Sequence, residues 1–218
     1  MLKGMLRIHQ FSFGVVIGLS MIGCAKSRVP RDARDAALPE LRNEIAARVA
    51  KDQAVQRELG ERIQAQQPVD AAVARRDSVF NANLEWMRLV LARHGWPGRR
   101  FVGDEGSHGA WLLLQHADQD TALQHTALKL LEGAVRAGDA SARDLAYLTD
   151  RVRVAEGRPQ LFGTQLEYDS RGCASPRRSE DPAQLDARRA SVGLEPIAQY
   201  VQTTMVALGR AAQCAAPK

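Results

Sequence analysis

Four charged side chains in the middle of the chain have the chemistry that general acid–base catalysis requires. His116 precedes Asp118 by two residues, and Asp150 and Arg151 are neighbours further along the chain. In a shared cleft, His116 could act as a general base oriented by Asp118 or Asp150, while Arg151 bound an anion. These four residues are the candidate catalytic set.

Further polar side chains could line the same cleft beside apolar helices. The candidates for ligand contact are His108, Gln115, Gln160, Thr164 and Gln165. The alternative is structural, because buried charges are normally paired and hydrogen-bonded. In that case Asp150 or Arg151 would anchor the loop from Gly157 to Gln165. The sequence leaves both interpretations open.

The spacing of the histidines argues against a metal site. On one helix, His108 and His116 would lie about 12 Å apart along the axis and about 80° apart around it, too far to bind one ion directly. No HExxH or CxxC spacing, GxSxG elbow or glycine-rich phosphate loop occurs in the chain. We expect no metal and no cofactor, and the sequence specifies no nucleophile.

The first 24 residues have the pattern of a lipoprotein signal peptide. Residues 1–10 include Lys3 and Arg7 but no acid, residues 11–23 carry no charge, and Gly23 directly precedes Cys24. The uncharged stretch is too short for a membrane span, which needs about 20 apolar residues. Met21-Ile22-Gly23-Cys24 resembles the bacterial lipobox, whose cysteine becomes the lipid-modified first residue. The alternatives are an ordinary signal peptide with a chance cysteine or a buried N-terminal helix.

Lipidation of Cys24 would determine the compartment and the first partner. Two or three acyl chains, at about 0.8 kcal/mol per buried methylene, hold a protein permanently on a membrane. Ala25 follows the cysteine, so the aspartate that retains enterobacterial lipoproteins in the inner membrane is absent. We expect a lipid-anchored protein of the bacterial envelope, on the periplasmic face of the outer membrane, with an unidentified envelope partner or ligand.

The charge balance does not indicate nucleic-acid binding. Without Lys3 and Arg7, the chain has 28 basic and 25 acidic residues, and the two signs alternate along helical stretches. The pairs Arg177-Arg178 and Arg188-Arg189 are expected to be solvated, although they could meet phospholipid head groups.

Cysteine usage suits an oxidising compartment. With Cys24 lipidated, Cys173 and Cys214 remain as an even pair. A bridge closing a loop of about 40 residues would stabilise the fold by roughly 4 kcal/mol. We expect this bridge; the alternative is two free thiols.

Helical periodicity runs through most of the remaining chain. The pattern predicts helices over 38–66, from about 68 to 94, and over 108–117, 121–136, 142–156, 183–191 and 196–214. Ser107, Asp120 and Ser141 are expected N-caps, and the apolar stretch 110–114 predicts a central helix. Residues 161–168, followed by a turn at 169–172, predict a short extended segment.

The predicted fold class is therefore mainly α. It is a single helical domain of about six to seven helices with at most one short β-hairpin. The expected organisation is a signal peptide over 1–23, a lipidated N-terminus and tether over 24–37, and a domain over 38–214.

Several short motifs occur in the order found in one bacterial family. They are Asp52-Gln53, Gly95-Trp96-Pro97, Ala110-Trp111-Leu112, Gln115-His116-Ala117-Asp118, Tyr147-Leu148-Thr149-Asp150-Arg151, Gly157-Arg158-Pro159-Gln160 and Gly163-Thr164-Gln165. Over residues 38–200 the chain resembles the family catalogued as domain of unknown function 6624. The resemblance implies a domain boundary and a fold but no activity. Phe162 departs from it, and Cys173 and Cys214 are additions of this chain.

Two functions from different classes follow. The first is a membrane-anchored lipoprotein whose domain is a binding or structural module. The alternative is a tethered periplasmic enzyme of the hydrolase type, using His116 with Asp118 or Asp150 and Arg151. Convergence of five side chains around an open cleft would favour the enzyme: His116, Asp150, Arg151, Gln160 and Gln165.

Overall fold

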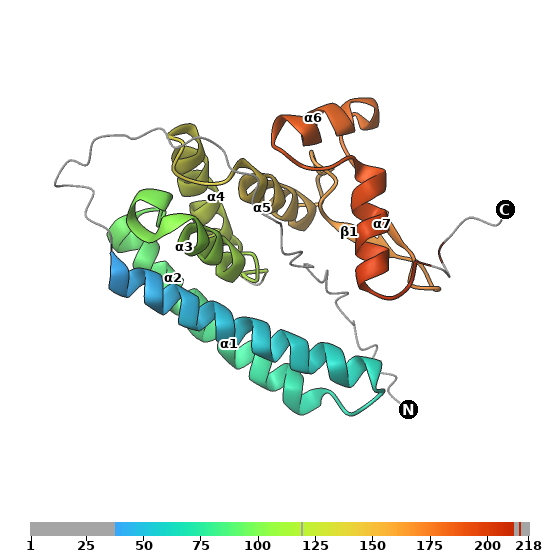
Figure 1. The fold of residues 1–218 in the computed structure, drawn as a ribbon, viewed down its shortest axis with the longest axis horizontal. Coiled ribbons are helices and arrows are strands. Elements are labelled where there is room, and N and C mark those ends of the chain that lie inside the picture. Colours follow the sequence, from blue (N-terminus) through green and yellow to red (C-terminus); the bar gives the residue numbers. More distant parts are fainter. Residues whose placement is uncertain (1–37, 119, 212–213, 215–218) are drawn as a thin grey trace.

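Two long antiparallel helices form one side of the molecule. In the computed structural model, α1 (Pro39–Gln64) and α2 (Asp70–His94) lie side by side along their whole length (Figure 1). Ile45 and Leu59 of α1 are buried, whereas Ile63, near the end of the helix, is exposed. The helices predicted over 38–66 and from about 68 to 94 are confirmed, with shorter bounds.

The structure describes residues 38–118, 120–211 and 214. The predicted signal peptide and tether lie outside the described residues. Within the described part, no helix is both long enough and apolar enough to cross a membrane.

The third helix begins earlier than predicted. α3 (Arg99–Leu114) contains a kink at Gly103, whose φ of 76° is a left-handed conformation that glycine adopts readily. Ser107 lies inside this helix and is not an N-cap, which corrects the prediction. Its Oγ instead accepts a hydrogen bond from the Trp96 indole Nε1 at 3.1 Å. Residues 110–114 are all buried against the other helices, as expected of a central helix.

Local capping residues define the next two helices. α4 (Thr121–Arg136) begins after Asp120, whose carboxylate accepts from the Leu123 amide, and α5 (Ala142–Ala155) begins after Ser141, whose hydroxyl accepts from the Asp144 amide. Both caps were predicted, and both are confirmed.

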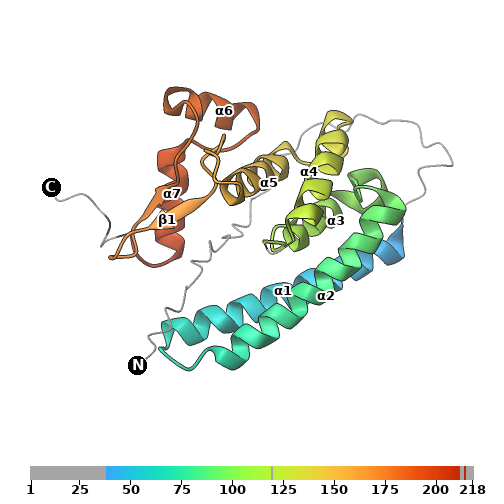
Figure 2. The same cartoon turned by 180° about the vertical axis from the view of Figure 1, so that it is seen from behind.

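The C-terminal part is a small unit beside α5. Strands β1 (Leu166–Tyr168) and β2 (Ala174–Pro176) pair antiparallel, with Leu166 opposite Pro176, and are followed by η1 (Pro182–Gln184), α6 (Leu185–Ser191) and α7 (Ile197–Ala207). Figure 2 shows this unit from behind, grouped at the α5 end of the molecule.

The chain after α7 departs from the predicted long helix. α7 ends at Ala207 instead of continuing to 214, because Gly209 adopts a φ of 66° and the Arg210 amide turns back to the Met205 carbonyl. The predicted Cys173–Cys214 disulfide is confirmed, and it joins the turn of the hairpin to this final segment. The mainly α fold class is also confirmed.

Candidate functional site

His116 lies just beyond the C-terminal end of α3 and is bound by a carboxylate from α1. Its Nδ1 is 3.2 Å from Oδ2 of Asp52, which is completely buried. Asp52 also accepts hydrogen bonds from Asn83 Nδ2 at 3.4 Å and Gln53 Nε2 at 3.2 Å. The Asp52 carboxylate can only accept hydrogen bonds. In the neutral His116 ring the hydrogen is therefore assigned to Nδ1, which leaves Nε2 as the acceptor.

The rest of the His116 ring contacts Phe80 and Gln56. Phe80 stacks on the ring with a centroid distance of 4.3 Å and an interplanar angle of 9°, and the Gln56 amide nitrogen is 3.5 Å from Nε2. The His116 side chain is 13% exposed. We call Asp52, Gln56, Phe80, Asn83 and His116 the His116 cluster. It offers a positioned imidazole nitrogen that could accept a hydrogen bond from a ligand or a proton from a reacting group.

The sequence contained one signal for Asp52, the partner of His116 that was not among the candidate residues. Ile45, Asp52 and Leu59 follow one another at seven-residue spacing, and all three are buried on the same stripe of α1. A charged residue at the centre of an apolar stripe requires a buried partner. The periodicity could have marked Asp52 as a site residue, although it could not have identified His116 as the partner.

Asp118 and Arg151 form a separate pair. Arg151 Nη1 is 2.8 Å from Asp118 Oδ1 and 2.9 Å from Oδ2, and the buried Gln124 amide donates to Oδ1 at 3.3 Å. Asp118 thus ties the chain after α3 to α5 and α4. The structure gives it no contact with the His116 ring.

Asp150 anchors a loop. Its fully buried carboxylate accepts from the backbone amides of Leu161 at 2.6 Å, Phe162 at 3.0 Å and Thr164 at 2.9 Å, and from the Thr164 hydroxyl at 3.0 Å. This geometry matches the structural alternative for Asp150. Arg151, the next residue on α5, takes no part in it.

Gln160 and Gln165 complete the same loop anchor. Gln160 Nε2 donates to the Gln165 carbonyl at 3.1 Å and to the Arg177 carbonyl at 2.7 Å, and its Oε1 accepts from the Gln165 amide at 2.9 Å. Both side chains are buried, as is Thr164. The five side chains whose convergence would favour an enzyme therefore occupy three separate places.

His108 lies apart from these three groups, on α3 beside Asp144 of α5. Its Nδ1 is 3.0 Å from Asp144 Oδ1, and its ring stacks on Trp111 at a centroid distance of 4.9 Å. The hydrogen bond to Asp144 raises the pKa of His108 above its usual value, although partial burial acts in the opposite direction. Gln115 is half-buried at the end of α3, and its backbone N–H donates to the Trp111 carbonyl at 2.9 Å.

The expectation of a solvated side chain is wrong for Arg189, whereas Arg188 is half-buried. Arg189 is completely buried, with Nε donating to the Glu195 carbonyl at 2.6 Å and its guanidinium 5.0 Å from the centre of the Tyr200 ring. Arg188 Nε donates to the Leu161 carbonyl at 2.8 Å. These loop carbonyl groups have no backbone hydrogen-bond partner in a helix or strand, and the two arginine side chains bind them instead.

The described residues contain no group of three or more His, Cys, Asp or Glu side chains placed to hold a metal ion. A family model described as a family of unknown function, DUF6624, matches residues 39–212. No curated protein and no solved structure matches the chain.

Proposed function

The chain belongs to this family of unknown function, and on that premise we propose that it is an envelope lipoprotein whose helical domain binds a ligand at the His116 cluster. The family supplies no activity, so the proposal depends on the N-terminal sequence and on the geometry around His116.

Support for the anchor comes from the lipobox-like residues that end in Cys24. Only this cysteine is positioned to receive a diacylglyceryl thioether at the cleavage site. The variant Cys24→Ser should be released from membranes or remain unprocessed, as measured by fractionation in high salt and by mass spectrometry. Normal processing together with retention on membranes would reject the anchor.

Support for the binding site comes from one observation, a partly exposed His116 ring that is held by a buried carboxylate. Asp52 fixes the ring through Nδ1, and Phe80 fixes its plane, so Nε2 has a defined direction beside the Gln56 amide. A preorganised acceptor next to an amide suits a ligand with hydroxyl or amide groups, since little side-chain entropy is lost on binding. Such groups are abundant in cell-wall material, the ligand class that we favour.

A thermal-shift titration with a soluble digest of bacterial cell wall tests the binding site. The wild-type protein should melt at a higher temperature in the digest, and His116→Gln should lose this shift because it removes the ring acceptor. His125→Gln is the matched control, since His125 is on α4, half-exposed, and pairs with Glu156 at 3.2 Å. A shift retained in His116→Gln would place the binding elsewhere.

A second candidate function, a hydrolase, is favoured by the same pair of residues. A buried carboxylate that orients a histidine is the arrangement by which enzymes hold a general base, which here would activate a water molecule. The variant Asp52→Asn would favour the opposite tautomer of His116, and in an enzyme turnover would then fall by orders of magnitude. Digest binding by wild-type protein without release of cleavage products, followed by mass spectrometry, would leave the binding module as the function.

A further inference from the structure

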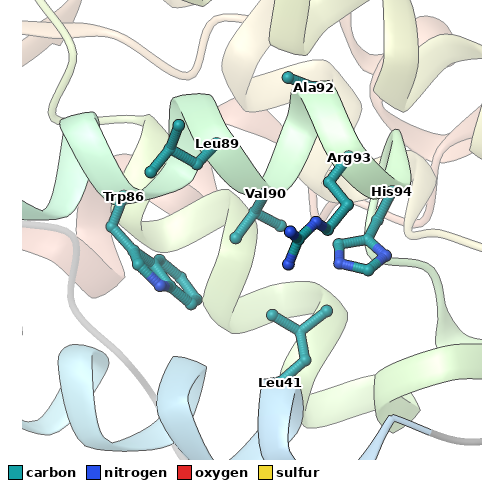
Figure 3. Close-up of a pocket in the computed structure, with 7 residues that line it drawn as sticks. All are labelled: Leu41, Trp86, Leu89, Val90, Ala92, Arg93 and His94. Atoms are coloured by element: carbon teal, nitrogen blue, oxygen red, sulfur yellow. The ribbon is translucent and has the colours of Figure 1, made fainter.

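A surface hollow of about 600 Å³ lies between the start of α1 and the C-terminal half of α2 (Figure 3). Its lining residues are Leu41, Trp86, Leu89, Val90, Ala92, Arg93 and His94. None of these residues belongs to the His116 cluster, so the hollow is a separate surface feature.

The apolar part of this surface has an interfacial character. Leu89 is 69% exposed, the largest exposure among the large hydrophobic side chains described. Trp86 is half-buried at the rim, with the Arg48 guanidinium 4.5 Å from its ring centre. Tryptophan beside an exposed aliphatic side chain is typical of the boundary between lipid and water.

The polar part of the lining is formed by Arg93 and His94. Arg93 and His94 are exposed, and among the described residues no ion pair involves either side chain. The nearby acids Glu85 and Glu44 pair with other arginines of the two helices, at 3.8 Å with Arg88 and at 2.7 Å with Arg48. Arg93 could therefore meet a phosphate, which a guanidinium binds through two parallel hydrogen bonds.

The hollow also lies where the tether joins the domain. α1 begins at Pro39, and Leu41 in its first turn lines the hollow. The amide of Leu38 donates to the Phe101 carbonyl at 2.8 Å, which fixes the chain against α3 at this end. Residues 24–37 span at most about 50 Å when fully extended. A lipid on Cys24 would thus keep this end of the domain close to the bilayer at a high effective concentration.

We propose that the membrane face, formed by Trp86, Leu89, Arg93 and His94, rests on the lipid head groups of the membrane that holds Cys24. Leu89 enters the boundary between head groups and acyl chains, Trp86 lies beside it, and Arg93 binds lipid phosphate. The inference deepens the proposed function and depends on its lipid anchor. It gives the domain a fixed orientation on the bilayer instead of free rotation about a tether.

The test uses the mature lipidated protein in vesicles of phosphatidylethanolamine and phosphatidylglycerol with brominated acyl chains. Bromine quenches tryptophan fluorescence at short range, and Trp96 and Trp111 are buried in the domain core, so quenching is expected to come from Trp86. Leu89→Asp and Arg93→Glu should each lose most of this quenching while the protein still floats with the vesicles. Val206→Asp is the matched control, because Val206 is 61% exposed on α7 and outside the membrane face.

The outcomes separate the inference from the anchor. Wild-type protein that fails to float would reject the anchor itself. Flotation without quenching, or quenching unchanged in both Leu89→Asp and Arg93→Glu, would overturn the membrane face while leaving the anchor in place. Trp86 emission in detergent micelles that shifts with protein concentration would show that a second copy covers the hollow, which would also overturn it.

Discussion

The Asp150 carboxylate shows how much structure one buried side chain can hold. It is the acceptor for three backbone amides and one hydroxyl of the loop that follows α5. Asp150→Asn replaces one acceptor oxygen by a donor that faces other donors, so we expect the free energy of unfolding to fall by about 3 kcal/mol or more. Urea unfolding followed by circular dichroism measures it.

Asp118→Asn is the natural comparison for this change. Asp118 is 55% exposed and pairs with Arg151 at the surface, so its loss should cost about 1 kcal/mol or less. Equal costs for the two variants would show that Asp150 is not the anchor of the loop.

His108 provides a pH dependence with a defined sign. The hydrogen bond to Asp144 raises the pKa of His108 in the folded protein. The stabilisation is therefore complete below the unfolded pKa of about 6.5 and is lost as the pH rises through the higher folded pKa. Its size should stay below about 1 kcal/mol, because the side chain is 49% exposed.

The variant His108→Gln makes this dependence measurable. Its unfolding free energy should fall below the wild-type value near about pH 5.5 and approach it near about pH 9, where the histidine is neutral. A difference that grows toward high pH would contradict the role of Asp144.

The sequence predicted which polar residues lie on a helix, but not which way the side chains of two neighbours point. The sequence placed Asp150 and Arg151 together on one helix but could not decide which of them anchors the loop. Neighbouring helical residues point about 100° apart, so Asp150 faces the loop while Arg151 faces Asp118. Only the packing of α5 decides between them. The pairing of Asp52 with His116, 64 positions apart, was likewise beyond a local pattern.

At the scale of helices, the contact between α1 and α3 depends on a missing side chain. A Cβ on Gly109 would lie 2.8 Å from Cγ2 of Ile45 and 3.2 Å from Cγ2 of Val49. Gly109→Ala should therefore destabilise the protein by about 1–3 kcal/mol through overpacking, despite the better helix propensity of alanine. Thermal unfolding should show a lower melting temperature.

Gly133→Ala in α4 separates packing from propensity. There the nearest atom to a new Cβ is 4.0 Å away, so the change should raise stability by about 0.5–1 kcal/mol. If both alanine variants shifted stability in the same direction, close approach of α1 and α3 would not be the cause.

The elements that the sequence predicted well carry their own end signals. Asp120 and Ser141 cap α4 and α5 with their own side chains, so a local pattern was sufficient. The start of α3 has no such cap. Its first amides donate instead to Asp139, Arg99 to the carbonyl at 2.8 Å and Arg100 to Oδ1 at 2.9 Å. A cap supplied from 39 positions away leaves no trace in the sequence around α3.

For the whole molecule, the disulfide closes the C-terminal unit. Cys173 and Cys214 are 41 positions apart, and their bridge encloses β2, α6 and α7. Reduction, or replacement of both cysteines by serine, should lower stability by up to about 4 kcal/mol through greater freedom of the unfolded chain. Chemical unfolding with and without reductant measures the change.

Thiol counting on protein isolated without reductant supplies the control. Blocking reagent should find neither Cys173 nor Cys214 free before reduction and both after it. Two accessible thiols in the untreated protein would contradict the bridge.

The aromatic contacts beside α5 give the molecule an optical signature. Trp111 of α3 meets Tyr147 of α5 edge-on at 5.8 Å, and Tyr147 meets Tyr200 of α7 in the same way at 6.2 Å. Rings held rigidly in a chiral environment produce near-ultraviolet circular dichroism, which disappears when side-chain packing loosens even though helices persist. The near-ultraviolet circular dichroism of the tyrosine and tryptophan bands thus reports, without any label, whether the C-terminal unit is packed against α5 and the central helix.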